Sequence, residues 1–201
     1  MNEAKIRLSG KEAELVLNAE FILTKNAILQ KAKNLLEGIM ETQQDILKTD
    51  PFIPIEIKSF APKISKGENY QGLPYLILDH PRYFHLPDIF TIRTFFWWGN
   101  FFSTTLHLSG EYKKRYAQAI IHSFEELQMK EYWCCVNEDP WQHHFEKENY
   151  VVLKDLGADN FKKNIDGNTF IKLAKKHSLH DWDRAGQLLL DDFKMLLKII
   201  R

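Results

Sequence analysis

The sequence has little of several features that define common protein classes. It contains only two cysteines, and its 27 Lys and Arg balance its 27 Asp and Glu. A balanced charge gives no overall field to attract nucleic acid or an acidic membrane surface. Cys134 and Cys135 are neighbours that would point to opposite faces of a strand, which disfavours a disulfide between them. Two reduced thiols suit a reducing compartment, so we expect a cytoplasmic protein without a nucleic-acid partner.

Long apolar runs and catalytic signatures are also missing. The N-terminal segment MNEAKIRLSGKEAELVL lacks the basic start and continuous apolar middle of a signal peptide. The uncharged run from Thr94 to Leu106 is shorter than the roughly 20 residues of a membrane-spanning helix. There is no glycine-rich phosphate loop, no G-x-S-x-G elbow and no RNA-binding aromatic signature. We therefore expect no membrane partner and none of the common nucleotide-binding or hydrolase folds.

The most unusual stretch that is present is RTFFWWGNFF, residues 93–102, with six aromatic rings in ten positions. Gly99-Asn100 predicts a two-residue type II′ loop between two antiparallel strands. In that register both faces of the hairpin are apolar, which indicates a sheet covered on both sides. The predicted cross-strand pairs are Trp98 with Phe101, Trp97 with Phe102, Phe96 with Ser103, Phe95 with Thr104, Arg93 with Leu106 and Ile92 with His107.

Amphipathic helices supply the cover for this hairpin. Ser9 and Glu12 have capping-box spacing, which predicts a helix from about residue 10. A second helix is expected from Thr24 or Asn26 until Asp50-Pro51. Further helices are expected from 109 or 110, at 159–165 and, after a capping-box-like start at 178, as the last element.

Strands and breaks complete the predicted pattern. YLILD reads as a short buried strand that ends at His80-Pro81, so DHPRYFHLPD is predicted as a loop. Strands are also expected at 131–136 and at 149–155. The spacing in TFIKLAKKH fits either a helix or a strand, and the preceding Gly167 and the helix start at Ser178 favour the strand. The segment 51–74 contains four prolines and two glycines, which predicts extended surface backbone.

These elements predict one α+β domain over residues 1–201. Its antiparallel sheet is centred on the hairpin at 89–109 and is covered by amphipathic helices. The N-terminal helices occupy 10–48, the Pro- and Gly-rich extended segment occupies 51–74, and the remainder is mixed α and β.

Small polar side chains inside the aromatic hairpin form the leading candidate site. An apolar pocket with a few polar groups that fix orientation is typical of small-molecule binding. The alternative is that Thr and Ser pairs only stabilise adjacent strands and that His107 lies near the edge of the sheet. In the predicted register one face carries the candidate ligand-binding residues Thr94, Phe96, Trp98, Ser103, Thr105 and His107.

Weaker candidates come from the preceding loop and from Arg93. His80, Arg82 and His85 lie between two X-Pro bonds, and rigidly held loops often carry function. A solvated, charge-rich turn without function is the alternative. Arg93 is expected among Phe95 and other apolar side chains, where its charge requires a carboxylate, an aromatic face or a ligand anion. We expect an internal acidic partner.

His143 and His144 lie near acidic residues in DPWQHHFEKE, which suggests a metal site. Their spacing matches neither H-E-x-x-H nor another metal motif. We therefore predict no metal site and no cofactor for the protein. The sequence alone leaves open whether His143 and His144 bind a metal ion.

The order of the elements resembles the YktB-like group of uncharacterised bacterial proteins. The resemblance covers most of residues 30–201 and implies a bacterial α+β sandwich, without assigning any functional residue. It is carried by KNLLEGIMETQQDILK, PYLILDHPR, FTIRTFFWWGNFFSTTLHL, YKKRYAQAIIHSFEEL and GQLLLDDFKMLLKII, in this order.

Three functional hypotheses follow from these patterns. The first is a small-molecule-binding or regulatory domain without catalysis, which uses the aromatic face. The second is an enzyme of unknown reaction that uses the His and Arg residues of segment 80–85, and the sequence leaves open whether the protein is an enzyme. The third is a self-association module in which the aromatic hairpin joins two copies of the chain.

Overall fold

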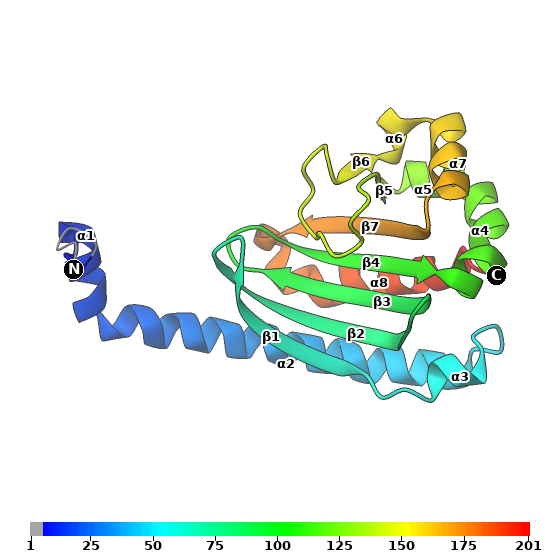
Figure 1. Ribbon diagram of the computed structural model, residues 1–201. Coiled ribbons are helices and arrows are strands. Elements are labelled where there is room, and N and C mark those ends of the chain that lie inside the picture. Colours follow the sequence, from blue (N-terminus) through cyan, green and yellow to red (C-terminus); the bar gives the residue numbers. More distant parts are fainter. Residues whose placement is uncertain (1–5) are drawn as a thin grey trace.

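A seven-stranded antiparallel sheet forms the centre of the molecule (Figure 1). The computed structural model describes residues 6–201, so the start of the N-terminal segment, where no signal peptide is expected, lies outside it. The α+β class and the single domain built on the aromatic hairpin are confirmed. In spatial order the strands are β1 (Lys63–Tyr70), β2 (Leu73–His85), β3 (Asp88–Trp97), β4 (Phe101–Ser109), β7 (Phe170–Ser178), β5 (Trp133–Cys135) and β6 (Tyr150–Val152).

Helices cover one face of this sheet, along which α2 and α8 run (Figure 1). No helix within residues 6–201 is both long enough and apolar enough to cross a bilayer. The helices are α1 (Gly10–Leu17), α2 (Ala19–Thr49), α3 (Ile55–Lys58), α4 (Gly110–His122), α5 (Phe124–Met129), α6 (Leu153–Leu156), α7 (Ala158–Gly167), a 3₁₀ helix (Leu179–Arg184) and α8 (Ala185–Lys198).

Capping residues set the N-terminal helix boundaries. The predicted capping box is present, since Ser9 Oγ accepts from Glu12 N at 3.3 Å and Glu12 Oε2 accepts from Ser9 N at 2.7 Å. The second helix begins at Ala19, earlier than the predicted Thr24 or Asn26, because Asn18 Oδ1 accepts from Phe21 N at 3.1 Å. It ends at Thr49, as predicted.

The hairpin exists where the sequence places it, but its predicted register is wrong by one residue. Its loop is the three-residue segment Trp98–Asn100, so Trp97 pairs with Phe101 and Phe96 pairs with Phe102. Asn100 N donates to Trp97 O at 3.1 Å, and Gly99 takes the positive φ of 72°. A glycine in the left-handed region suits three-residue hairpin loops as well as two-residue ones. Because side chains alternate along a strand, this change moves one strand's residues to the opposite face relative to the other strand.

The predictions of extended backbone at 51–74 and of a loop at 79–88 are both wrong in part. Segment 51–74 contains α3 and the whole of β1, which forms an edge of the sheet. Strand β2 continues past Pro81 to His85, because Pro81 falls in a bulge between Asp79 and Arg82. A proline is tolerated there because a residue in a bulge does not need to donate a backbone hydrogen bond to the neighbouring strand.

The C-terminal half follows the predicted order with shorter strands. TFIKLAKKH forms β7, the strand that was favoured over a helix, and it pairs with β4. Helix α7 covers the predicted helix at 159–165. The strands expected at 131–136 and 149–155 shorten to β5 and β6, of three residues each. Cys134 and Cys135 are free, and they belong to hydrophobic clusters on opposite faces of the sheet.

Gly110 joins β4 to α4 at a position that excludes a side chain. Its φ is 57°, and a Cβ there would overlap the carboxylate of Asp88. Asp88 Oδ1 accepts from Glu111 N at 2.8 Å and so caps α4, whereas Ser109 makes no side-chain cap. The helix start was predicted, but its capping residue comes from the neighbouring strand.

We predict that Gly110→Ala lowers the free energy of unfolding by about 1–3 kcal/mol, because it adds both backbone strain and a clash. Gly38→Ala is the matched control, since Gly38 lies inside α2 with no atom within 4 Å of an added Cβ. That control is expected to stabilise the protein by up to about 1 kcal/mol. Urea denaturation measures both, and equal effects of the two substitutions would contradict the assignment.

Candidate ligand-binding site

The observed register divides the six leading candidates between the two faces of the sheet. Ser103 and Thr105 share a face with their partners Phe95 and Arg93, and His107 lies on the same face. Thr94 and Phe96 lie on the opposite face, which α2 and α8 cover. The predicted single face is therefore wrong, because the hairpin loop has one residue more than expected.

The helix-covered candidates belong to the hydrophobic core. Phe96 is 1 % exposed and lies between the rings of Phe102 and Trp182, at centroid distances of 5.3 Å and 5.8 Å. Trp98 packs against the same cluster from the hairpin loop, and Thr94 is fully buried opposite Thr104. None of these side chains lines a cavity on the other face of the sheet.

A buried ion pair lies at the centre of that other face. Arg93 donates from Nε to Asp79 Oδ1 at 2.7 Å and from Nη2 to Asp79 Oδ2 at 2.9 Å. Two parallel bonds of this kind give the strongest side-chain geometry between Arg and a carboxylate. Asp79 is therefore the internal acidic partner that Arg93 was expected to have. A third bond runs from Arg93 Nη1 to His143 Nε2 at 3.1 Å.

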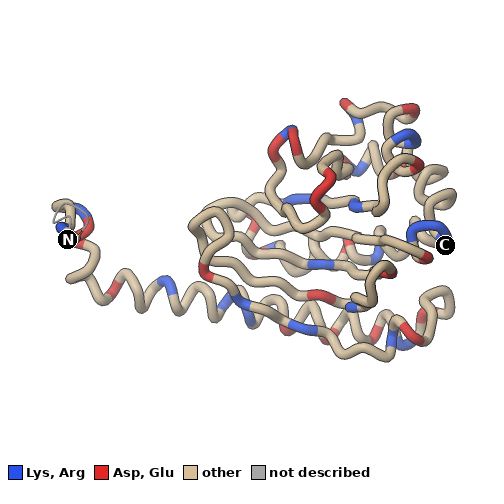
Figure 2. The backbone as a smooth tube through the Cα atoms, viewed as in Figure 1, with Lys and Arg blue, Asp and Glu red and all other residues tan. Residues whose placement is uncertain are grey.

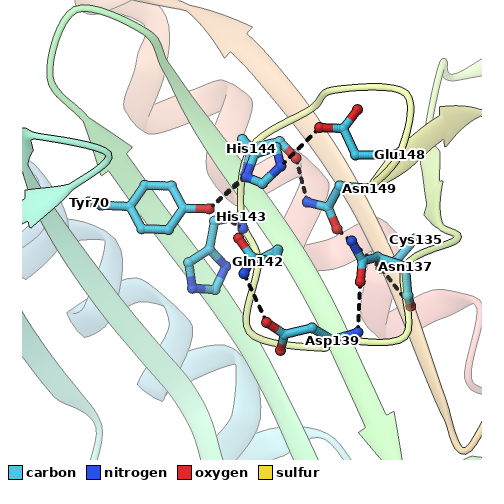
Figure 3. A network of polar contacts seen from close by, with 9 residues as sticks. All are labelled: Tyr70, Cys135, Asn137, Asp139, Gln142, His143, His144, Glu148 and Asn149. Carbon is cyan, nitrogen blue, oxygen red and sulfur yellow. Dashed lines mark hydrogen bonds and ion pairs between the residues drawn. The ribbon is translucent and has the colours of Figure 1, made fainter.

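His143 belongs to residues 136–149, here called the roof segment, which crosses this face between β5 and β6 (Figures 1 and 3). Tyr70 Oη accepts from the backbone N–H of His143 at 2.6 Å and of His144 at 3.1 Å. The same hydroxyl lies 3.0 Å from His144 Nδ1, to which it donates its proton. One side chain from β1 thus satisfies three polar groups of the roof segment.

Lys172 holds the roof segment from β7. Its Nζ donates to Pro140 O at 2.8 Å and also to Gln142 O. The pKa of Lys172 is lowered from 10.5 to about 8, mainly by burial and to a smaller extent by the nearby Arg93. Two carbonyl acceptors offset part of the cost of placing an ammonium group beneath the segment.

Short turns shape the roof segment around Asn137, Asp139 and Gln142 (Figure 3). Asn137 Oδ1 accepts from Asp139 N at 2.8 Å, and Asp139 accepts from Trp141 N at 2.9 Å and from Gln142 Nε2 at 2.8 Å. These bonds lower the pKa of Asp139, the backbone bond from Trp141 most strongly. The indole of Trp141 is 46 % exposed, although its backbone is fixed.

Two adjoining hollows lie around Trp141, between the roof segment and the sheet. They share Trp141, Leu86 and Ile89 as lining residues and have volumes of about 390 and 460 Å³. The remaining lining of the first hollow is Lys63, Ser65, Asp79, Arg82, Phe84 and Arg93. The remaining lining of the second is Pro87, His107, Ser109, Gly110, Lys113, Lys114, Pro140, Thr169 and Phe170. Together we call them the Trp141 cleft.

His107 forms an uncharged wall of the second hollow. Its ring lies 5.5 Å from Trp141 and 5.6 Å from Phe170, and it is 4 % exposed. Burial lowers the pKa of His107 to about 3, with smaller contributions from Lys172 and Arg93. His107 is therefore neutral at physiological pH, and its Nε2 has no hydrogen-bond partner among the described residues.

The weaker candidates do not form one site. Arg82 lines the Trp141 cleft, whereas His80 lies on the helix side in a separate hollow with Leu47 and Phe60. Burial lowers the pKa of His80 to about 4. His85 is exposed at the end of β2 and stacks near Tyr83. The bulge at Pro81 separates these neighbours, because it shifts the alternation of β2.

His143 and His144 serve to hold the roof segment. His144 Nε2 lies 3.7 Å from Glu148, and His143 contacts Arg93. Burial lowers the pKa of His143 well below its usual value, so the ring is neutral and accepts from Arg93. Across residues 6–201, no group of three His, Cys, Asp or Glu side chains lies close enough to hold a metal ion.

Sequence reasoning missed several residues of the cleft. Trp141 stands beside the histidine pair that suggested a metal, and Phe84 and Lys63 stand in segments predicted to be loop or surface backbone. Lys172 carried a usable signal, because a lysine between Ile171 and Leu173 in a strand requires internal acceptors. The contact of Tyr70 with the roof segment spans 73 residues and left no local signal.

No family model, curated protein or solved structure matches this chain. The resemblance in element order to the YktB-like group stays a prediction, and the site is interpreted from its own geometry.

Tyr70→Phe is expected to loosen the roof segment, because it leaves two backbone N–H groups without an acceptor, at a cost of about 1–3 kcal/mol. Hydrogen exchange of residues 136–149 should become faster, while exchange in β2 and β3 stays unchanged. Tyr75→Phe is the control, since Tyr75 packs beside Tyr70 and its hydroxyl has no hydrogen bond among the described residues. Equal exchange in both variants would show that Tyr70 does not hold the segment.

Acid is expected to destabilise the protein through His107. Its usual pKa is 6.5 and its folded-state pKa is about 3, so the unfolded chain alone binds a proton between these values. The neutral His107 costs no free energy of unfolding above pH 6.5. Below pH 6.5 the free energy of unfolding decreases, and it continues to decrease until the pH falls to about 3. The loss at pH 5 is about 2 kcal/mol.

His107→Gln should therefore lose about 2 kcal/mol less than the wild type when the pH falls from about 7.5 to 5. Urea denaturation at the two pH values measures this difference. His122→Gln, at an exposed histidine, is the control and should keep the wild-type pH dependence. A parallel pH dependence of His107→Gln and the wild type would contradict a neutral His107.

Proposed function

We propose that the protein is a small-molecule-binding domain without catalysis and that the Trp141 cleft holds its ligand. The ligand is a small anion with an apolar, preferably aromatic, body. The observation that carries this proposal is the lining of the cleft, which combines five Lys or Arg side chains and one carboxylate with exposed apolar surface. The chain as a whole carries no net charge, so this positive excess is local.

Two cations of the first hollow are available to a ligand. Arg82 donates from Nε to Ala61 O at 3.1 Å, and the two Nη groups have no other partner within residues 6–201. Lys63 is exposed and has no partner within the same residues. Arg93, by contrast, is already occupied by Asp79 and His143. An anionic group is therefore expected at Arg82 and Lys63, where a guanidinium offers two parallel donors.

The apolar part of the cleft suits a flat ring. Trp141 and Phe84 have ring centroids 6.2 Å apart, and Leu86 and Ile89 line the same hollow. Phe170 and the neutral His107 continue this surface into the second hollow. The aromatic and aliphatic walls of the cleft are typical of a small-molecule site, and its cations would fix the orientation of an anionic ligand.

The same geometry supports binding over catalysis. Burial lowers the pKa of both His107 and His143, so both rings are uncharged at physiological pH, and both belong to the walls and supports of the site. The enzyme hypothesis needs His80 and Arg82 together, and no observation favours it, since these residues line different hollows. The proposal includes a cytoplasmic location, which the two free thiols support.

Isothermal titration calorimetry with naphthalene-2-carboxylate tests the proposal. Its uncharged counterpart, naphthalene-2-carboxamide, has the same body and should bind at least 10-fold more weakly, because a charge-assisted bond contributes about 1.5–3 kcal/mol. Affinity for the carboxylate should fall as salt is raised from about 0.05 to 0.5 M. Equal affinity for the two compounds, or no binding of either, would count against an anion site.

Two substitutions assign the binding to the cleft. Arg82→Gln should weaken binding of the carboxylate by about 10-fold or more and leave the weak binding of the carboxamide unchanged. Trp141→Ala should weaken both compounds. Arg184→Gln is the control, since Arg184 is exposed and pairs with Asp181 far from the cleft. Wild-type affinity in Arg82→Gln would place the anion elsewhere.

A further inference from the structure

The exposed apolar side chains of this protein are concentrated at its N-terminal end. Thirteen large apolar side chains are exposed within residues 6–201, and eight of them precede Thr24. They lie on or beside α1 and at the start of α2, which project away from the sheet (Figure 1). They are Ile6, Leu8, Leu15, Val16, Leu17, Phe21, Ile22 and Leu23.

Residues 6–28, here called the N-terminal arm, are not covered by the rest of the described chain. Helix α1 has no buried residue, and the first buried residue of α2 is Leu29. The arm is nevertheless ordered at its base, where Lys25 pairs with Glu68 of β1 at 2.8 Å. A helix with apolar residues around its circumference is stable in water only when another surface covers it.

We infer that the N-terminal arm is a dimerisation element, covered by the arm of a second copy of this chain. A second copy supplies a surface of the same apolar character, and a two-fold axis between the arms buries each set of side chains once. This inference is independent of the proposed ligand and of the Trp141 cleft.

The apolar area of two arms reaches the size that a specific interface needs. A fully exposed Leu, Ile or Phe side chain offers on the order of 100 Å² for burial. The eight side chains are between 39 % and 85 % exposed. Two arms therefore offer roughly 1,000 Å² of apolar surface, which is the lower limit for a stable interface.

The charges of the arm favour another arm over a membrane surface. Helices that lie on anionic membranes carry an excess of Lys and Arg on their polar face. Basic and acidic side chains are instead equal in number and interspersed along residues 6–28 (Figure 2). They are Arg7, Lys11 and Lys25 against Glu12, Glu14 and Glu20.

The N-terminal arm has exposed apolar side chains, whereas the aromatic rings of the hairpin strands are buried. A self-association surface was one hypothesis for the hairpin, but Phe95, Phe96 and Phe102 are at most 1 % exposed. Trp97 and Phe101 are at most 8 % exposed. The apolar surface available to a second copy therefore lies on the N-terminal arm.

Sedimentation equilibrium of the full chain tests this inference. The wild type should have twice the 23.7 kDa mass of one chain at tens of micromolar, and it should dissociate on dilution. The double variant Leu17→Glu, Leu23→Glu should be monomeric, with association weakened at least 100-fold. The control Ile55→Glu, Met129→Glu changes two equally exposed residues outside the arm and should stay dimeric. Thermal unfolding by circular dichroism should show that both variants are folded.

A covalent link locates the contact. Phe21→Cys should give a disulfide-linked dimer on mild oxidation, whereas Ile55→Cys should not, and the two native cysteines are 1 % exposed. The inference is overturned by a monomeric wild type at about 100 µM or by a dimer that survives the arm substitutions. It is also overturned if the wild type stays monomeric and cosediments through its arm with phosphatidylglycerol vesicles.

Discussion

The structure depends on the need to cover both faces of one aromatic hairpin. Phe95 and Phe96 are adjacent in β3 and point to opposite faces, and each is 1 % exposed. Helices α2 and α8 cover one face, with hydrogen bonds satisfied inside the helices. The other face is covered by irregular backbone, whose N–H and C=O groups need partners from the sheet. Tyr70 and Lys172 are those partners.

The roof segment, which covers the second face, determines where charged groups and open space lie on that face. The roof segment is held to the sheet by a few polar contacts, and hollows remain beside these contacts. The two helices on the opposite face pack closely against the sheet. Burial of Arg93 and Lys172 is balanced by Asp79, by His143 and by roof carbonyls, so their charges are used internally. Arg82 does not belong to this network and lines the Trp141 cleft, with two Nη groups that have no partner within residues 6–201. The Trp141 cleft is therefore a consequence of how the roof segment is held.

Local patterns predicted the elements better than they predicted the faces. The capping box at Ser9 and the hairpin around Gly99 followed from local residue patterns, and strand β7 followed from the helix and turn signals on either side of it. The hairpin register did not, because Gly99 at positive φ fits loops of two or three residues. The one additional residue in the hairpin loop places Thr94 and Ser103 on opposite faces of the sheet. The contacts that hold the roof segment join residues between 30 and 74 positions apart, so no short window of sequence contained them.

The most direct test of the account is an NMR spectrum of the indole N–H groups during titration with naphthalene-2-carboxylate. The protein has five tryptophans, of which Trp141 lines the cleft and Trp98 and Trp182 pack against the helix-covered face. The account predicts a saturable shift of the Trp141 signal, with Trp98 and Trp182 unchanged. Shifts of Trp98 or Trp182 without a change at Trp141 would contradict a binding site under the roof segment.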